Sequence, residues 1–181
     1  MNMFILERIV KINDNLYKTM LSTGKKVLLE NSYKDLTIRY IAEICDVSVG
    51  TVYNCFSSKE MLVASIMLED WLELMKNAER EVAAAESCAD GLEAVFNMVR
   101  RFVEIYHGVF ETSGVVLGMH AEQHNKLIEQ LGALISGLLA RFGKNTDPDP
   151  TRFLAETLLL AGCRRTVAFD DIRVFIERVT N

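Results

Sequence analysis

Apolar residues recur at intervals of three and four along most of the chain, which is the spacing of helices that bury one face. No segment of convincing length alternates between apolar and polar residues, as a strand with one buried face would. The sequence therefore predicts an all-α fold. The expected helices cover residues 15–30, 38–45, 48–56, 58–85, 90–107, 111–120, 121–142, 150–169 and 170–179.

The expected helix that starts at residue 58 carries capping residues. Ser57 and Glu60 have the spacing of a capping box, with Ser57 at the N-cap and Glu60 at the third helical position. Phe56 and Met61 occupy the two positions of a hydrophobic staple around it. This start is predicted to be firm, and the helix to be long.

The two short helices at residues 38–45 and 48–56 have the spacing of a helix-turn-helix. Ala42 is small where the second helix would cross the first, and Asp46 tolerates the left-handed backbone that the turn needs. Small residues open the second helix, so that it can approach DNA closely: Val49, Gly50 and Thr51. On spacing alone, a plain helical hairpin is the alternative interpretation.

The residue pattern of this segment adds to its spacing. The stretch "LTIRYIAEICDVSVGTVYNCFSSKEML" resembles the DNA-binding domain of the TetR family of bacterial transcriptional regulators over roughly residues 16–68. Two positions depart from that family's pattern: Asp46 replaces the glycine common in the turn, and Asn31-Ser32 replaces the glycine near the end of the preceding helix. Asn and Asp tolerate the left-handed region better than most residues, so neither change excludes the fold.

The resemblance implies a function and a set of DNA contacts. The second helix of the motif would lie in the major groove, the start of the first would reach the backbone or a flanking base, and Lys59 would bind a phosphate. Val49 offers an apolar surface to a thymine methyl, and Asn54 could pair with adenine. Tyr53 as a packing residue and Lys59 as a solvated charge remain alternatives. The expected DNA-binding residues are Thr37, Arg39, Ser48, Val49, Gly50, Thr51, Tyr53, Asn54 and Lys59.

The resemblance also implies two domains, a DNA-binding domain over residues 1–68 and an effector-binding and dimerisation domain over residues 69–181. Charge is divided in the same sense. Residues 1–60 hold eight Lys/Arg and seven Asp/Glu, whereas the remainder holds twelve and eighteen, so the net charge of -5 belongs to the C-terminal two thirds. The first third is near neutral, which is a weak footprint for a nucleic-acid binder.

Composition points to a cytoplasmic protein with no membrane association. The four cysteines include no C-x-x-C pair, which fits a reducing compartment better than a disulfide framework. The N-terminus lacks the core of a signal peptide, because Glu7, Arg8 and Lys11 interrupt its apolar start. The longest apolar run, residues 158–163, is far shorter than the ~20 residues that a membrane span needs.

Two further sites are expected in the C-terminal part. Met and aromatic residues suit an adaptable apolar pocket, although ordinary core packing is the alternative for each of them. The candidate ligand-binding residues are Trp71, Met75, Phe96, Phe102, Tyr106, Phe110 and Met119. Residues 153–165 are apolar nearly all round, and the family resemblance implies a four-helix dimer interface there, an ordinary core helix being the alternative. The candidate interface residues are Leu154, Leu158, Ala161 and Arg165.

No catalytic residues, cofactor or metal are expected. His120 and His124 stand at i and i+4, which suits zinc on one helix face, but no third ligand is obvious and the pattern is not H-E-x-x-H. The sequence therefore predicts a dimeric, ligand-responsive regulator, most simply a repressor, that binds a palindromic operator in double-stranded DNA and responds to a small-molecule effector. The alternatives are a helical ligand-binding or enzymatic protein whose helix-turn-helix is structural, and an effector-independent activator or nucleoid-associated protein.

Overall fold

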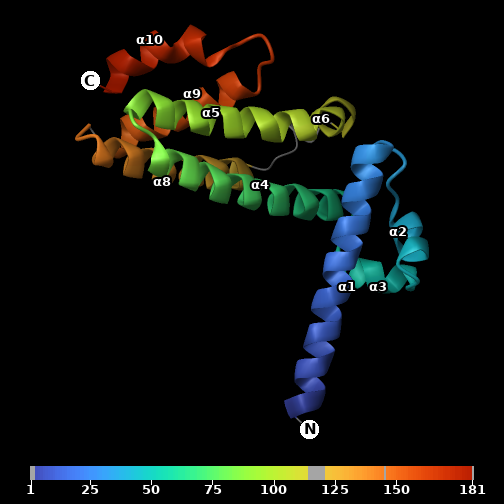
Figure 1. Cartoon of the computed structure of the whole chain (residues 1–181). Coiled ribbons are helices and arrows are strands. Elements are labelled where there is room, and N and C mark those ends of the chain that lie inside the picture. The colour runs from blue at the N-terminus through green and yellow to red at the C-terminus, as the bar shows by residue number, and fades with distance from the viewer. Residues whose placement is uncertain (1–2, 114–120, 145, 181) are drawn as a thin grey trace. The chain divides into compact units, whose positions relative to one another are not determined.

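The computed structural model describes the backbone of residues 3–113, 121–144 and 146–180, and the side chains of residues 14–110, 125–144, 146–174, 176 and 178. Helices make up every regular element of these ranges, which confirms the all-α fold (Figure 1). None of the described helices is both long enough and apolar enough to cross a bilayer. The helices are α1 (Met3–Glu30), α2 (Ile38–Ile44), α3 (Val49–Cys55), α4 (Lys59–Ala84), α5 (Cys88–Ile105), α6 (His107–Ser113), α8 (Ala121–Arg141), α9 (Pro148–Gly162) and α10 (Phe169–Thr180).

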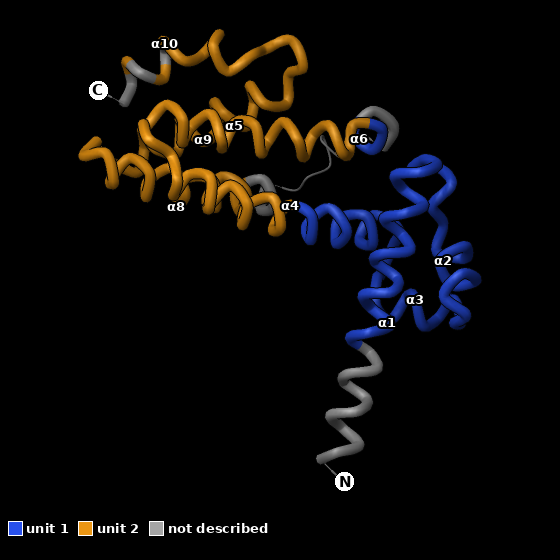
Figure 2. The backbone as a smooth tube through the Cα atoms, in the orientation of Figure 1, with its two compact units in different colours: residues 1–70, 108–114 blue, residues 71–107, 115–181 orange. Residues whose placement is uncertain are grey.

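The chain divides into two compact units (Figure 2). Unit 1 comprises Met1–Asp70 together with Gly108–Gly114, and unit 2 comprises Trp71–His107 together with Val115–Asn181. The long helix α4 contributes to both, since its residues up to Asp70 belong to unit 1 and its residues from Trp71 belong to unit 2.

Unit 1 is built from α1, α2, α3 and the first part of α4. Its centre is apolar, and the rings of Tyr17 and Phe56 stack with their centroids 4.9 Å apart. Helices α1 and α4 approach closely at Gly24, where an added Cβ would lie 2.9 Å from Ile66 Cδ1. The largest fully buried side chains of this unit are Phe56, Met20, Leu21, Leu36, Ile41, Leu62 and Ile66.

The same two helices of unit 1 are joined by one strong polar contact. The ammonium of Lys25 on α1 lies 2.5 Å from Oδ1 of Asp70, a buried carboxylate on α4. A buried charge is costly unless it is paired, so this contact fixes how α4 lies against α1.

Unit 2 is a helical bundle in which α5, α8 and α9 pack together and α10 adds to α5. Its close approaches also use glycine, since an added Cβ would lie 2.5 Å from Leu138 Cδ1 at Gly91 and 2.6 Å from Val99 Cγ1 at Gly162. Burial of apolar side chains between these helices is the main stabilising term. The largest fully buried side chains of this unit are Trp71, Tyr106, Phe96, Leu92 and Ile128.

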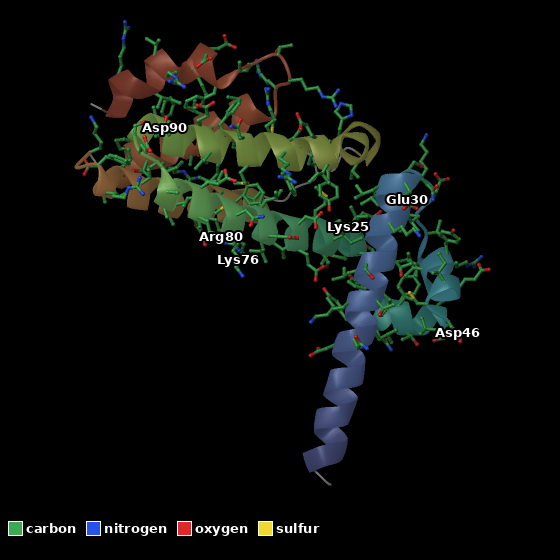
Figure 3. The ribbon with its side chains drawn as sticks, in the orientation of Figure 1. Lys25, Glu30, Asp46, Lys76, Arg80 and Asp90 are labelled. Atoms are coloured by element: carbon green, nitrogen blue, oxygen red, sulfur yellow. The ribbon has the colours of Figure 1, made fainter. Side chains whose placement is uncertain are left out.

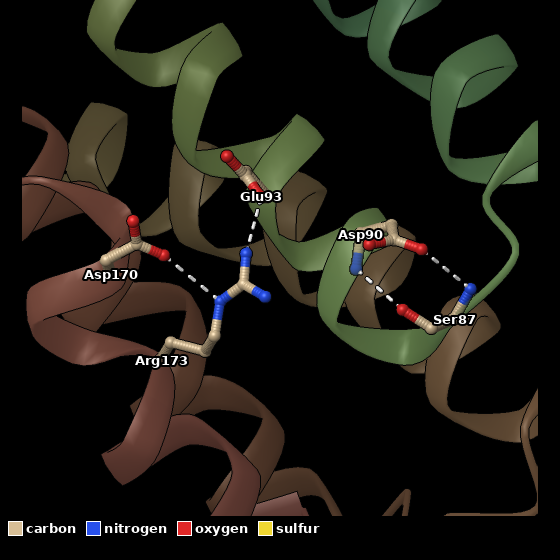
Figure 4. Close-up of polar contacts among 5 residues, drawn as sticks. All are labelled: Ser87, Asp90, Glu93, Asp170 and Arg173. Carbon is tan, nitrogen blue, oxygen red and sulfur yellow. Dashed lines mark hydrogen bonds and ion pairs between the residues drawn. The ribbon is translucent and has the colours of Figure 1, made fainter.

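Polar contacts close the helix ends of unit 2. Helix α5 begins in a full capping box, in which Ser87 and Asp90 each accept from the other's backbone N–H at 3.1 Å (Figure 4). Arg173 on α10 pairs with Glu93 at 3.0 Å and with Asp170 at 3.3 Å. Arg141, at the end of α8, donates to the carbonyls of the last turn of α4, which have no partners within their own helix.

The start of α4 differs from the expected one by a residue. The hydroxyl of Ser58, not that of Ser57, accepts the N–H of Met61 at 3.2 Å, so Ser58 is the capping residue and Glu60 lies at the second helical position. The predicted hydrophobic staple between Phe56 and Met61 is also wrong, because Met61 is 50% exposed while Phe56 is buried. With two adjacent serines, the spacing to Glu60 did not identify which one caps the helix.

The C-terminal helices also differ from expectation. The predicted helix 150–169 starts earlier, with Pro148 at its first position after Asp147, and ends at Gly162. Arg100 of α5 donates to the carbonyls of Arg164 and Val167, which stabilises the turn that follows. A tertiary contact therefore holds the segment after α9, and periodicity within the segment gave no sign of it.

Candidate nucleic-acid interface

Helices α2 and α3 of unit 1 form a helix-turn-helix. Asp46 lies in the turn between α2 and α3 (Figure 3). It has φ 52°, and no other described residue except glycine has a positive φ, which confirms the left-handed turn expected there. The N–H of Val47 then donates to the carbonyl of Ala42 at 2.9 Å and closes the end of α2. The turn is thus held by backbone hydrogen bonds and does not depend on a glycine.

Side-chain caps fix where both helices of the motif begin. Thr37 Oγ1 accepts the N–H of Tyr40 at 3.1 Å at the start of α2, and Ser48 Oγ accepts the N–H of Thr51 at 3.1 Å at the start of α3. The hydroxyls of Ser48 and Thr51 also lie 2.8 Å apart and bond to each other. These two hydroxyls therefore already serve the helix start.

One face of α3 anchors it in the core. Val52 is fully buried in the middle of the helix, and the neighbouring residues turn outward around it. By helical geometry, Gly50 and Asn54 point most directly away from Val52, and Val49 and Tyr53 lie one turn apart on one flank. Val49 is 38% exposed and Tyr53 is 51% exposed, so the alternative that Tyr53 is a packing residue has no support in its burial.

Gly50 stands on this exposed face without a packing reason. A Cβ added there would meet only Ser48 Oγ, at 3.7 Å, which is an ordinary contact. Glycine in a helix costs roughly 1 kcal/mol relative to alanine. The protein's own packing does not require this glycine, whereas close approach of the helix to another molecule would.

The start of α4 brings three polar side chains together. The Lys59 ammonium lies 3.9 Å from the ring centroid of Tyr33, and the Tyr33 hydroxyl donates to Glu60 Oε1 at 3.3 Å. Burial lowers the pKa of Lys59, while the charges of Glu60 and Asp35 act in the opposite sense. The pKa of the Glu60 carboxyl is held below its ordinary value, first by its own backbone N–H and then by the Ser58 hydroxyl.

Lys59 is therefore held in place over an aromatic ring and is not a freely solvated charge. Sequence reasoning missed the part played by Tyr33, and no signal in the sequence pairs a tyrosine in a connecting segment with a lysine 26 positions later. Of the remaining predicted contact residues, Thr37 and Arg39 are exposed at the start of α2.

The candidate ligand-binding residues of unit 2 divide into groups. The rings of Trp71, Phe102 and Tyr106 contact one another in sequence, with centroids 5.2 and 5.3 Å apart. Phe96 instead packs against Phe169 at 5.7 Å.

The other candidate ligand-binding residues lie elsewhere. Met75 is buried in the same unit, Phe110 lies in the part of α6 that belongs to unit 1, and Met119 lies outside the described residues. A polar residue that the sequence did not single out joins the aromatic group, since Gln130 Oε1 accepts the Trp71 indole N–H at 2.7 Å.

The candidate interface residues lie on α9 and in the segment that follows it. Leu154, Leu158 and Ala161 are buried within their own unit, whereas Arg165 follows the helix and is exposed. The opposite side of α9 carries exposed apolar residues, with Phe153 at 53% and Leu160 at 63% exposure. Tertiary packing, which the sequence pattern did not resolve, decides which apolar side of this helix faces outward.

The candidate zinc ligands His120 and His124 lie outside the residues whose side chains are described. Within the described part of the chain, no three His, Cys, Asp or Glu side chains gather in a group that could hold a metal ion.

Taken together, the left-handed turn, the capped and exposed α3 and the lysine at the start of α4 define a helix-turn-helix DNA-binding module. A family model described as "Bacterial regulatory proteins, tetR family" matches residues 20–66, which cover this module. Over these residues the chain is similar to the TetR family of bacterial regulatory proteins.

Curated proteins are similar to part of the chain. The HTH-type transcriptional regulator UidR of Escherichia coli (strain K12) is 29% identical over 103 residues, covering 57% of this chain and 49% of UidR. The chain thus spans about half the length of this curated relative. Relatives of this kind are named as transcriptional regulators and not as enzymes.

Solved structures share the fold over nearly the whole chain. A TetR-family transcriptional regulator from Pectobacterium atrosepticum has a TM-score of 0.63 at 18% identity, covering 93% of this chain and 90% of that one. The transcriptional regulator FadR from Bacillus subtilis, solved in complex with stearoyl-CoA, has a TM-score of 0.61 at 15% identity, covering 91% and 98%. At these identities the likeness concerns the fold.

Proposed function

We propose that this protein is a dimeric transcriptional repressor that binds a palindromic operator through α3 and releases it when a small-molecule effector binds unit 2. The observation that carries the proposal is the exposed face of α3, where Gly50 leaves space that no part of the protein fills. A glycine at this position would allow α3 to come close to the base edges in the major groove. Effector control requires that the effector bind one of two conformations more tightly.

The DNA contacts proposed are those of the helix-turn-helix and the start of α4. Val49, Tyr53 and Asn54 would meet base edges or the backbone in the major groove, and Arg39 would reach the flank. Lys59, preorganised over Tyr33, would bind a phosphate near the positive end of α4. The alternative of an enzyme with a structural helix-turn-helix is not favoured, because the curated relatives are named as regulators.

The effector is proposed to bind unit 2 near its aromatic group. The Trp71–Gln130 hydrogen bond places one polar pair among apolar rings, which is the composition of a site that orients an apolar or amphipathic ligand. The stearoyl-CoA complex of the FadR neighbour makes acyl-CoA molecules a reasonable first set to screen. Trp71 is the sole tryptophan of the chain, so its fluorescence would report binding directly.

Dimerisation is proposed through the exposed sides of α8 and α9. Phe153 and Leu160 supply apolar area on α9, and Gly137 on α8 has no neighbour within 4 Å of a Cβ added there. A pair of subunits would place two copies of α3 about 34–36 Å apart, one helical turn of DNA.

The first test is selection of bound sequences from a random pool of DNA duplexes at moderate salt with purified protein. Enrichment of a palindrome supports the dimeric regulator and supplies an operator for effector screening. A folded, dimeric protein that enriches no sequence contradicts the proposal and directs attention to unit 2.

The Lys59→Ala variant tests the phosphate contact. It is expected to weaken binding to all duplexes alike and to lower the slope of log affinity against log salt by about one, because one phosphate contact releases about one counterion. Unchanged affinity together with an unchanged salt slope would place Lys59 away from DNA.

A further inference from the structure

Helix α3 carries no positive charge with which to read guanine. Its sequence, VGTVYNC, has no charged residue, and no Lys or Arg occurs between Arg39 and Lys59. The commonest specific contact to guanine is an Arg or Lys that bonds to O6 and N7 in the major groove. Base pairs beneath α3 therefore lack that partner.

The hydroxyls of Ser48 and Thr51 at the start of α3 are partly used within the protein. Ser48 Oγ accepts the Thr51 N–H and bonds the Thr51 hydroxyl, so the two groups together keep one O–H donor for another partner. The other exposed side chains on α3 are those of Val49, Tyr53 and Asn54, with Cys55 at the end of the helix.

These exposed groups match one kind of base pair. An apolar side chain in the major groove favours the C5-methyl of thymine, and an asparagine amide pairs in two places with N6 and N7 of adenine. Gly50, beside them on the outward face, allows α3 to come close enough for such short side chains to reach the bases.

We propose that α3 reads A·T base pairs, with Val49 against a thymine methyl and Asn54 on an adenine, and that any guanine essential to the half-site lies outside the base pairs under α3. This inference rests on the proposed function, since it names the class of operator that α3 recognises. The proposed recognition is direct contact with the bases and not recognition of DNA shape, because each named side chain contacts a particular chemical group of a base.

The test uses the duplex enriched from the random pool and removes one base methyl at a time. Each thymine of a half-site is replaced by deoxyuridine, which lacks only the C5-methyl, and affinity is measured for wild type and for Val49→Ala. Loss of one buried methyl is expected to lower wild-type affinity about fourfold at one thymine. Val49→Ala is expected to bind the original duplex about fourfold or more weakly and to show no further loss at that thymine.

Asn54→Ala gives a second, independent measure. Selection repeated with this variant is expected to lose the preference for adenine at one position, with about a tenfold loss of affinity for the original duplex. Val174→Ala is the matched control for Val49→Ala, because it makes the same valine-to-alanine change at an exposed position of unit 2. It is expected to keep the wild-type affinity and the wild-type response to each deoxyuridine. Val49 and Asn54 are exposed, so neither truncation opens a cavity, and thermal melting checks that both variants fold.

The inference is overturned if no thymine methyl matters to wild type, if its effect persists unchanged in Val49→Ala, or if either variant relaxes the preference at a G·C pair. Wild type that enriches no sequence at all counts against the proposed function itself. The two failures are therefore distinguishable.

Discussion

The glycines of unit 2 and the glycine on α3 of unit 1 differ in what surrounds them. In unit 2, Gly91 and Gly162 stand where a Cβ would lie 2.5 and 2.6 Å from a neighbouring side chain, so packing requires them. On α3 of unit 1, Gly50 has no such neighbour and is exposed. The first kind of glycine permits two helices of the protein to approach, and the second is explained by approach to a partner.

The same contrast holds for the large side chains. Aromatic residues of unit 2 such as Trp71 and Tyr106 are buried, and their contribution is to stability. Tyr53 and Val49 of α3 are exposed and contribute little to the fold. Mutations on α3 should therefore change DNA binding with little effect on stability. Mutations in the core of unit 2 should instead lower stability.

Trp71→Ala is expected to have the largest effect on stability. Removing this buried indole loses its contact with Phe102 and leaves Gln130 without its donor, so the free energy of unfolding should fall by about 3–5 kcal/mol. Denaturant titration measures the change. Tyr53→Ala is the counterpart on α3 and should change stability by about 0.5 kcal/mol or less while it weakens operator binding. Equal destabilisation by both changes would contradict the expected difference between the buried Trp71 and the exposed Tyr53.

The same glycine-to-alanine change should have opposite effects at two positions. Gly162→Ala places a Cβ against the branched Val99 and is expected to destabilise the protein by about 1–3 kcal/mol. Gly50→Ala is expected to leave the protein as stable or up to about 1 kcal/mol more stable, because alanine favours the helix. Its operator affinity should nevertheless fall, and gel-shift titration measures this. A Gly50→Ala variant with wild-type affinity would remove the main support for close approach by α3.

The two adjacent serines at the start of α4 should contribute unequally to stability, because only Ser58 caps the helix. Ser58→Ala removes the acceptor for the Met61 N–H and is expected to cost about 1 kcal/mol of unfolding free energy. Ser57→Ala should change it by about 0.5 kcal/mol or less. Thermal or chemical unfolding of the two variants, measured side by side, would reverse this order if Ser57 were the cap.

Glu60 should give the smallest effect, visible as a pH dependence. Its folded-state pKa lies below the ordinary value of 4.5, so its ionised form stabilises the fold at higher pH, and this stabilisation is lost as the pH falls through the folded pKa. The wild type should therefore exceed Glu60→Gln in melting temperature near neutral pH, and the difference should shrink on acidification. A difference that grows at low pH would show that the carboxylate is not stabilising.

Much of unit 1 follows from local sequence. Asp46 in the turn, Thr37 and Ser48 at the helix starts and the buried Val52 could all be predicted, because turns and caps depend on residues within a few positions of one another. The candidate DNA-binding residues came instead from the resemblance to the TetR family, and they stay a prediction. A contact at this site that was not foreseen joins Tyr33 to Lys59 across unit 1.

In unit 2 the sequence determined that the segments are helical and apolar, but not which sides of them face inward. A helix that is apolar nearly all round, such as α9, gives no periodic signal to separate its buried Leu158 from its exposed Leu160. At its end, Gly162 packs closely on Val99, and Arg100 bonds the segment that follows, although both lie on α5 more than sixty residues away. Only tertiary structure decides such features, because the groups that fix them are distant in the chain and meet only when the helices pack.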